Sequence, residues 1–107
     1  FNRDLYYANA YKLMKEVLML INTSEYPVEW FILDSGGFSG IDYTSLQMLK
    51  ELKTRLDELN IVFGITTVLP SLMKQFEDSG FINVLGKENL YKKVYNALQA
   101  FEDKNNI

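Results

Sequence analysis

Apolar side chains recur near the start of the chain with the spacing of an amphipathic helix. They stand at positions i, i+4, i+7 and i+8: Leu13, Val17, Leu20 and Ile21. Residues 5–7 come before them and form a leucine and tyrosine run of the kind that is enriched in strands. The pattern therefore predicts a short strand at residues 5–7, followed by a helix that ends near Ile21.

Two nearly continuous apolar runs, residues 28–33 and 61–66, are typical of strands that are covered on both faces. Between them, leucines repeat at helical spacing while charged residues occupy the opposite face, which predicts a helix over residues 43–59. Asp42 stands immediately before this helix and is its expected N-cap. The leucine stripe consists of Leu46, Leu49, Leu52, Leu56 and Leu59.

The last third of the chain predicts two more helices and one more strand. Pro70 suits the first turn of a short helix, and Gly80 suits its C-terminus. Residues 81–85, which follow Gly80, are expected to form a last short strand. A closing helix is expected to begin near Lys87, with an apolar face formed by Leu90, Tyr91, Val94, Leu98 and Phe101.

The alternation of strands and helices defines the expected fold class. It predicts an α/β domain with a mainly parallel or mixed sheet of four to five strands, flanked by helices and joined by right-handed crossovers. The chain has 107 residues, of which 48% are hydrophobic, and this suffices for one packed core. We therefore expect residues 1–107 to form a single domain.

Composition removes several classes of function. A formal net charge of −3 argues against nucleic acid as a partner, because phosphates are bound by clustered basic residues. The chain contains neither Cys nor His, so it lacks a thiolate nucleophile, the commonest general base and the commonest transition-metal ligand. Its longest apolar stretch, residues 17–21, is far below the ~20 residues of a membrane-spanning helix. We expect a protein without catalytic residues, metal or cofactor.

The strongest candidate site is the glycine-rich loop that leads from the strand at residues 28–33 into the leucine-rich helix. In an open α/β sheet, ligands bind at this carboxyl end of a strand. Backbone N–H groups, the helix dipole and nearby hydroxyls suit an anion there. The site residues that we predict are Ser39, Gly40, Asp42, Tyr43, Thr44 and Ser45.

Other features of the same loop favour a purely structural turn with a helix cap. Asp42 already places a carboxylate at the helix start, where an anion would have to bind. The loop also lacks the lysine of a phosphate-binding P-loop and the glycine spacing of a dinucleotide fingerprint. Asp34 is the nearest other carboxylate, but no adjacent acidic pair accompanies it, so we expect no metal site. A structural turn and a functional surface both remain open.

Three blocks of sequence resemble the STAS domain of SulP-type anion transporters, the group that includes sulfate permeases. Residues 5–10, LYYANA, are similar to a signature near the start of these domains. Residues 33–61, LDSGGFSGIDYTSLQMLKELKTRLDELNI, resemble the family's D-x-S-G-V-x-x-I-D-x-[ST]-G-x-x-x-L block and the helix exit that follows it. Residues 72–98, LMKQFEDSGFINVLGKENLYKKVYNAL, resemble the family's ending. The ordered blocks cover almost the whole chain.

The resemblance implies a regulatory domain that forms the C-terminal part of an integral membrane transporter, after its membrane-spanning part and on the cytoplasmic side of the inner membrane. Expected partners are the membrane domain of the parent transporter, a cytosolic protein, a second copy through the parent transporter, and a weakly bound nucleotide or anion. The connection at residues 22–27 is brief, which suits a bacterial member. We also expect the chain to lack the N-terminal edge strand that usually precedes the LYYANA segment in this family.

Two alternative functions stay open. In the related anti-sigma-factor antagonists, the residue after the second Asp of the central block is a phosphorylated Ser; here Tyr43 holds that position and Thr44 follows as a conceivable phosphoacceptor. Ser45 and Asn60 both stand where the family often has Gly. A nucleotide- or anion-handling enzyme is the remaining alternative, and it rests on the glycine-rich loop alone.

Overall fold

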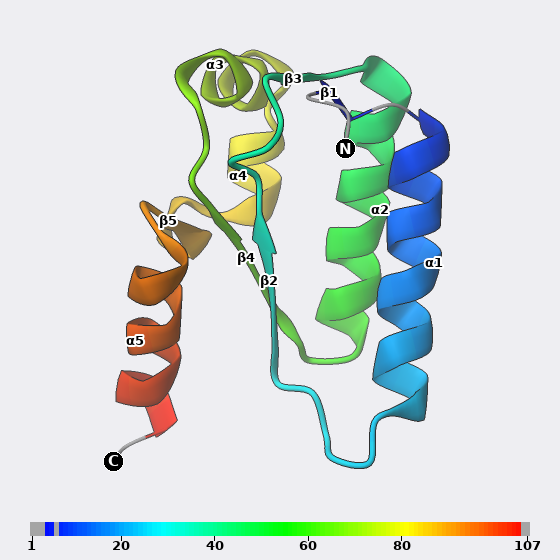
Figure 1. Cartoon of the computed structure of the whole chain (residues 1–107), viewed down its shortest axis with the longest axis vertical. Helices are drawn as coiled ribbons and strands as arrows, with labels where there is room; N and C mark the ends of the chain where they lie inside the picture. Colours follow the sequence, from blue (N-terminus) through cyan, green and yellow to red (C-terminus); the bar gives the residue numbers. More distant parts are fainter. Residues whose placement is uncertain (1–3, 6, 106–107) are drawn as a thin grey trace.

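Three parallel strands form the sheet at the centre of the molecule, in the order β2 (Trp30–Asp34), β4 (Val62–Thr66) and β5 (Leu90–Tyr91) (Figure 1). The computed structural model describes residues 4–5 and 7–105. β2 and β4 are in register along their whole length, from Trp30 opposite Val62 to Asp34 opposite Thr66. A second, separate ladder joins β1 (Asp4–Leu5) to β3 (Gly40–Ile41), also in parallel.

Helices cover both faces of the three-stranded sheet. α1 (Tyr7–Thr23) and α2 (Tyr43–Glu58) lie side by side on one face, and α5 (Val94–Asn105) covers the other (Figure 1). The alternation of side chains along β2 reflects this: Phe31 packs into the main core, whereas the Trp30 ring contacts the Phe101 ring of α5, with centroids 5.4 Å apart. α3 (Pro70–Ser79), α4 (Phe81–Leu85) and the short 3-10 helix η1 (Lys87–Asn89) complete the fold.

The main core is built around the leucine stripe of α2. Leu52 is 1% exposed, and α2 packs against α1, β4 and α4. Phe63 and Ile65 of β4 point to the same face of the sheet, two residues apart, and both are fully buried. Three further helices contribute fully or almost fully buried side chains to this core: Ala10, Met14, Val17, Leu72, Phe76, Phe81 and Leu85.

The predictions made from long, periodic segments are confirmed. The run at residues 28–33 overlaps β2, which ends one residue later at Asp34, and the run at 61–66 contains β4. The leucine-rich segment forms α2, the second-longest described helix after α1. Pro70 begins α3, and Gly80 ends it in the left-handed conformation with φ +80°. The expected α/β class with parallel strands and flanking helices is confirmed, although the strands divide into a three-stranded sheet and a separate pair.

Two predictions about the last third of the chain are wrong. Residues 81–85 form a helix instead of a strand, because Phe81 and Leu85 are buried at helical spacing while Val84 between them is exposed. The closing helix begins at Val94 instead of near Lys87, and the segment before it pairs with β4 as strand β5. A strand of two residues is too short to show a periodic pattern in the sequence. Its structure depends on pairing with β4, which lies more than twenty residues earlier in the chain.

Helix faces near the ends of the chain also differ from expectation. Tyr7 belongs to α1 and not to a strand, whereas Tyr6 lies outside the described residues. On α1 the buried stripe is Ala10, Met14 and Val17, and Leu20 is 68% exposed. On α5 only Ala97 is buried and Phe101 half-buried, while Val94 and Leu98 are exposed, and Leu59 lies exposed just after α2.

The position of Leu52 in the core predicts a large cost for its truncation. Leu52→Ala removes buried carbons from a site enclosed by several elements, so the free energy of unfolding should fall by about 2 to 5 kcal/mol. Denaturant unfolding of Leu20→Ala provides the matched control, since the same change at an exposed helix position should alter stability by about 0.5 kcal/mol or less. Equal losses for the two variants would contradict the assigned core.

Candidate glycine-loop site

The candidate loop, residues 35–42, begins at the carboxyl end of β2 and is anchored there on β4. Ser35 is buried, its amide donates to the Thr66 carbonyl at 2.9 Å, and its hydroxyl donates to the same oxygen at 2.9 Å. The Asp34 carboxylate accepts from the Gly36 amide at 3.1 Å and from the Thr66 hydroxyl at 3.2 Å. These contacts fix the first turn of the loop to the edge of the sheet.

The far part of the loop is held by side chains of α3. The Gln75 side-chain oxygen accepts from the Ile41 amide at 3.0 Å, and its NH₂ group donates to the Ile41 carbonyl at 2.7 Å. One turn earlier on the same helix, the Ser71 hydroxyl donates to the Ser39 carbonyl at 2.6 Å. On its other side, this segment pairs with β1. The loop therefore lies between β1 and α3.

Asp42 caps α2 as the sequence predicts. Its backbone is extended, with φ −81° and ψ 167°, and its carboxylate accepts from the Ser45 amide at 2.8 Å. This contact satisfies one of the otherwise free N–H groups of the first turn, and it places a negative charge at the positive end of the helix dipole. The predicted cap is confirmed, and its carboxylate disfavours an anion at the same point.

The predicted site residues divide into an exposed and a buried group. The Tyr43 side chain is 74% exposed, and Thr44 and Ser39 are exposed as well, whereas Gly40 and Asp42 are half-buried. Ser45 differs, because it is fully buried and its hydroxyl has no hydrogen-bond partner among the described residues. The Ser45 hydroxyl therefore cannot touch a partner in this conformation. The sequence signal for this burial is that Ser45 stands four residues before Leu49, on the same face of α2 as the leucine stripe.

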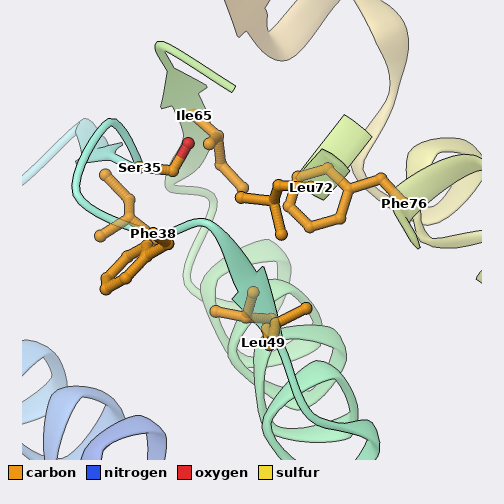
Figure 2. A pocket seen from close by; sticks show the side chains of 8 residues that line it. Ser35, Phe38, Leu49, Ile65, Leu72 and Phe76 are labelled. Carbon is orange, nitrogen blue, oxygen red and sulfur yellow. The ribbon is translucent and has the colours of Figure 1, made fainter. Parts of the chain in front are cut away.

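A small void lies beneath the loop. Figure 2 shows side chains from the loop, α2, β4 and α3 converging on it, and its volume is about 10 Å³, which is room for about one water molecule. Its lining residues are Leu33, Ser35, Phe38, Ile41, Leu49, Ile65, Leu72 and Phe76. Since this lining is almost entirely apolar and the volume is minimal, the void is a packing gap and no ligand pocket.

A larger open cleft, which sequence reasoning missed, lies between α1 and the start of the loop. Its volume is about 660 Å³, within the range of small-molecule sites. Charges of both signs lie on it, since Lys12 and Glu16 form an exposed pair 3.9 Å apart and Asp34 faces them from the loop side. No local pattern reveals this cleft, because residues 17–32 separate its two walls in the sequence.

Near this end of the sheet lie the ionisable side chains of Asp34, Asp42 and Tyr91. Burial, assisted by the negative charge of Glu88, raises the pKa of the Tyr91 hydroxyl, so Tyr91 stays protonated at neutral pH. Asp34 and Asp42 are each engaged by the backbone of their own turn. Within residues 4–5 and 7–105, no three acidic side chains converge in a group that could hold a metal ion.

Fold and loop together define a small parallel α/β domain in which backbone and capping contacts hold the loop after β2. A family model described as the STAS domain matches residues 1–99, and the chain belongs to this family. The structure is similar to a sulfate transporter family protein from Wolinella succinogenes, with a TM-score of 0.80 and 23% identity over 94% of this chain and 79% of that one. It also resembles the STAS domain of a SulP transporter from Vibrio cholerae, with a TM-score of 0.77 and 17% identity over 96% of this chain and 83% of that one.

Sequence relatives include much longer proteins. A probable sulfate transporter of Mycobacterium tuberculosis is 27% identical over 101 residues, which are 94% of this chain and 18% of that protein. Probable sulfate transporter 3.5 of Arabidopsis thaliana is 27% identical over 96 residues, which are 90% of this chain and 15% of that protein. This chain thus spans less than a fifth of these relatives. Among its described helices, none has both the length and the hydropathy needed to cross a membrane.

The cap contact predicts a defined loss when Asp42 is changed. Asp42→Ala leaves the first-turn amides without their carboxylate acceptor, so the free energy of unfolding should fall by about 1 kcal/mol in a denaturant titration. Asp42→Asn keeps a capping oxygen and should stay within a few tenths of a kcal/mol of the parent sequence. The cap assignment fails if both variants lose the same amount.

The buried hydroxyl of Ser45 predicts a gain in stability. Ser45→Ala removes a polar atom that is desolvated without a partner and improves helix propensity, so thermal or denaturant unfolding should show about 0.5 to 1.5 kcal/mol of added stability. Ser79→Ala is the contrasting control, because the Ser79 hydroxyl donates to the Phe76 carbonyl and accepts from the Phe81 amide. A loss of stability in Ser45→Ala would mean that its hydroxyl has a partner.

Proposed function

We propose that this chain is a regulatory, non-catalytic domain of a SulP-type anion transporter, placed on the cytoplasmic side of the inner membrane. One observation carries the proposal: nearly the whole chain aligns with a small part of proteins named as probable sulfate transporters, 18% of one of them. The remainder of such a protein is long enough to contain a membrane-embedded transport unit. The transported anion would be selected there and not in this domain.

A binding role is favoured by the arrangement of the described residues, among which no reactive centre is assembled. STAS domains of transporters are generally non-catalytic, and this chain has neither His nor Cys to act as base or nucleophile. The carboxylates at the carboxyl end of β2 and at the start of α2 are occupied by backbone amides. We infer that the domain acts through contacts with other parts of the transporter or with a cytosolic protein.

The surface that we assign to these contacts is the exposed part of the loop and the first turn of α2, namely Ser39, Gly40, Asp42, Tyr43 and Thr44. Tyr43 presents an aromatic ring to solvent at the start of the helix, and such rings are common anchors in protein interfaces. Since Asp42 already neutralises the helix N-terminus, protein contact is favoured over strong anion binding. The membrane domain of the parent transporter is the first expected partner. A second copy of this domain is the next, brought near when two transporter chains associate.

A phosphorylation switch of the anti-sigma-factor antagonist type is the second candidate function. The observation in its favour is the exposed side chain of Thr44 in the first turn of α2, next to the position that carries the phosphorylated Ser in those antagonists. Mass spectrometry of the protein isolated from its own cells separates the two functions. A phosphate on Thr44 in a polypeptide without membrane-spanning segments favours the antagonist, and an unmodified Thr44 in a long membrane protein favours the transporter.

The proposed surface predicts a binding defect without a folding defect. Thr44→Glu adds a negative charge beside Asp42 at an exposed position, so the unfolding free energy should change by about 0.5 kcal/mol or less. Its affinity for the purified membrane domain of the parent transporter should fall at least several-fold in a titration, because the charge lies inside the contact.

Thr54→Glu is the control for this experiment, since Thr54 is an exposed threonine further along the same helix, away from the loop. It should bind like the parent sequence. Equal affinities for all three proteins, together with unmoved amide signals of residues 39–45 when the membrane domain is added, would place the contact surface elsewhere.

A further inference from the structure

The loop that carries the proposed contact surface lies against the connection from β4 into α3 at its start and against α3 itself further along. Gly36 lies so close to Thr67 that a Cβ on this glycine would stand 3.0 Å from the Thr67 side-chain methyl. Further along, Ser39 meets Ser71, and Ile41 meets Gln75. Contacts at three successive points therefore couple the loop to residues 67–75.

Gln75 makes the most specific of these contacts. Its amide engages both the N–H and the carbonyl of Ile41, at 3.0 and 2.7 Å, as the backbone of a neighbouring strand would. Ser71 and Gln75 are four residues apart on α3, so both side chains leave the same face of the helix. One helix face thus supplies side-chain hydrogen bonds on either side of Gly40, immediately before the cap residue Asp42.

Packing around this contact is incomplete on two sides. The void of about 10 Å³ lies between the loop and α3, with Phe38 and Ile41 facing Leu72 and Phe76 across it. Beyond the cap, the buried Ser45 hydroxyl has no partner among the described residues. Gaps and unsatisfied polar atoms both weaken packing, so the hydrogen bonds from α3 add to the apolar contacts of Phe38 and Ile41 in holding the loop.

We propose that Ser71 and Gln75 form a latch that fixes residues 39–42 in the conformation in which Asp42 caps α2 and Tyr43 and Thr44 are presented to a partner. The latch makes α3 a positioning element of the contact surface, although α3 supplies no residue to that surface. The inference rests on the proposed function of the loop as a contact surface. The latch itself is a property of the isolated chain and can be measured without a partner.

Amide hydrogen exchange followed by NMR tests the latch on the 107-residue chain. Gln75→Leu keeps the apolar bulk next to Phe76 but removes both hydrogen bonds, so the Ile41 amide should exchange about tenfold faster and the Ser45 amide should follow it. Gln75→Glu keeps an acceptor for the Ile41 N–H at neutral pH but loses the donor to the Ile41 carbonyl. Its Ile41 exchange rate should therefore lie between those of Gln75→Leu and the parent sequence.

Two further variants keep the test specific. Gln99→Leu makes the same change at an exposed position of α5 and should leave loop exchange unaltered. Ser71→Ala should speed exchange in residues 39–42 by a smaller factor than Gln75→Leu, since it removes one hydrogen bond instead of two. In each latch variant, the amides of β4 should keep their protection, because the main core does not depend on these contacts.

Two results would overturn the proposal. One is unchanged exchange of the Ile41 and Ser45 amides in Gln75→Leu. The other is an equal acceleration in β4 and in the loop, which would mean that Gln75 supports the whole fold and not the loop. Failure of the contact surface looks different: Thr44→Glu would then bind the membrane domain normally while Gln75→Leu still released the loop.

Discussion

The burial of the α2 leucine stripe is the interaction on which the other elements depend. α2 packs against α1, β4 and α4, and Leu52 and Leu56 at its centre are almost completely removed from solvent. Because close-packed side chains enclose the helix on several sides, it cannot shift along its axis without opening cavities. Its first turn therefore stands at a fixed point relative to the end of β2, and the loop between them has to span that fixed distance.

How much of this fold the sequence reveals depends on the length of each pattern. The leucine stripe of α2 repeats over four turns, and β2 and β4 are apolar along most of their length, so period and run length identify them. Residues 81–85 are four apolar residues and Asn83 between two glycines, a segment too short to distinguish a strand from a helix. Contact with α3 decides for the helix, where the rings of Phe76 and Phe81 meet with centroids 4.9 Å apart. Leu90 and Tyr91 become a strand only because β4 offers them a free edge.

The candidate site divides in the same way. The local sequence identifies Asp42 as the cap, because its carboxylate accepts a hydrogen bond from an amide only three residues further along the chain. Ser45 was predicted as a surface hydroxyl, although its place in the leucine repeat puts it on the buried face of α2. The contacts of Gln75 with Ile41 bridge 34 residues, and those of Ser71 with Ser39 bridge 32. No local pattern encodes such pairs, so only the three-dimensional arrangement reveals how the loop is held.

The cap also determines what kind of partner this surface suits. A bare helix N-terminus attracts anions, but here the Asp42 carboxylate lies on the first-turn amides and opposes that attraction. The exposed groups beside it are the Tyr43 ring and the Thr44 side chain. In the proposed contact surface they would act through shape, apolar contact and hydrogen bonding. A partner that fits these groups gains little from long-range electrostatic attraction. Differences in its affinity should therefore appear mainly in the dissociation rate and less in the association rate. Binding of this kind is stronger when the loop is already ordered, because ordering a group on binding costs free energy and lowers the affinity. The hydrogen bonds from α3 supply that order in advance.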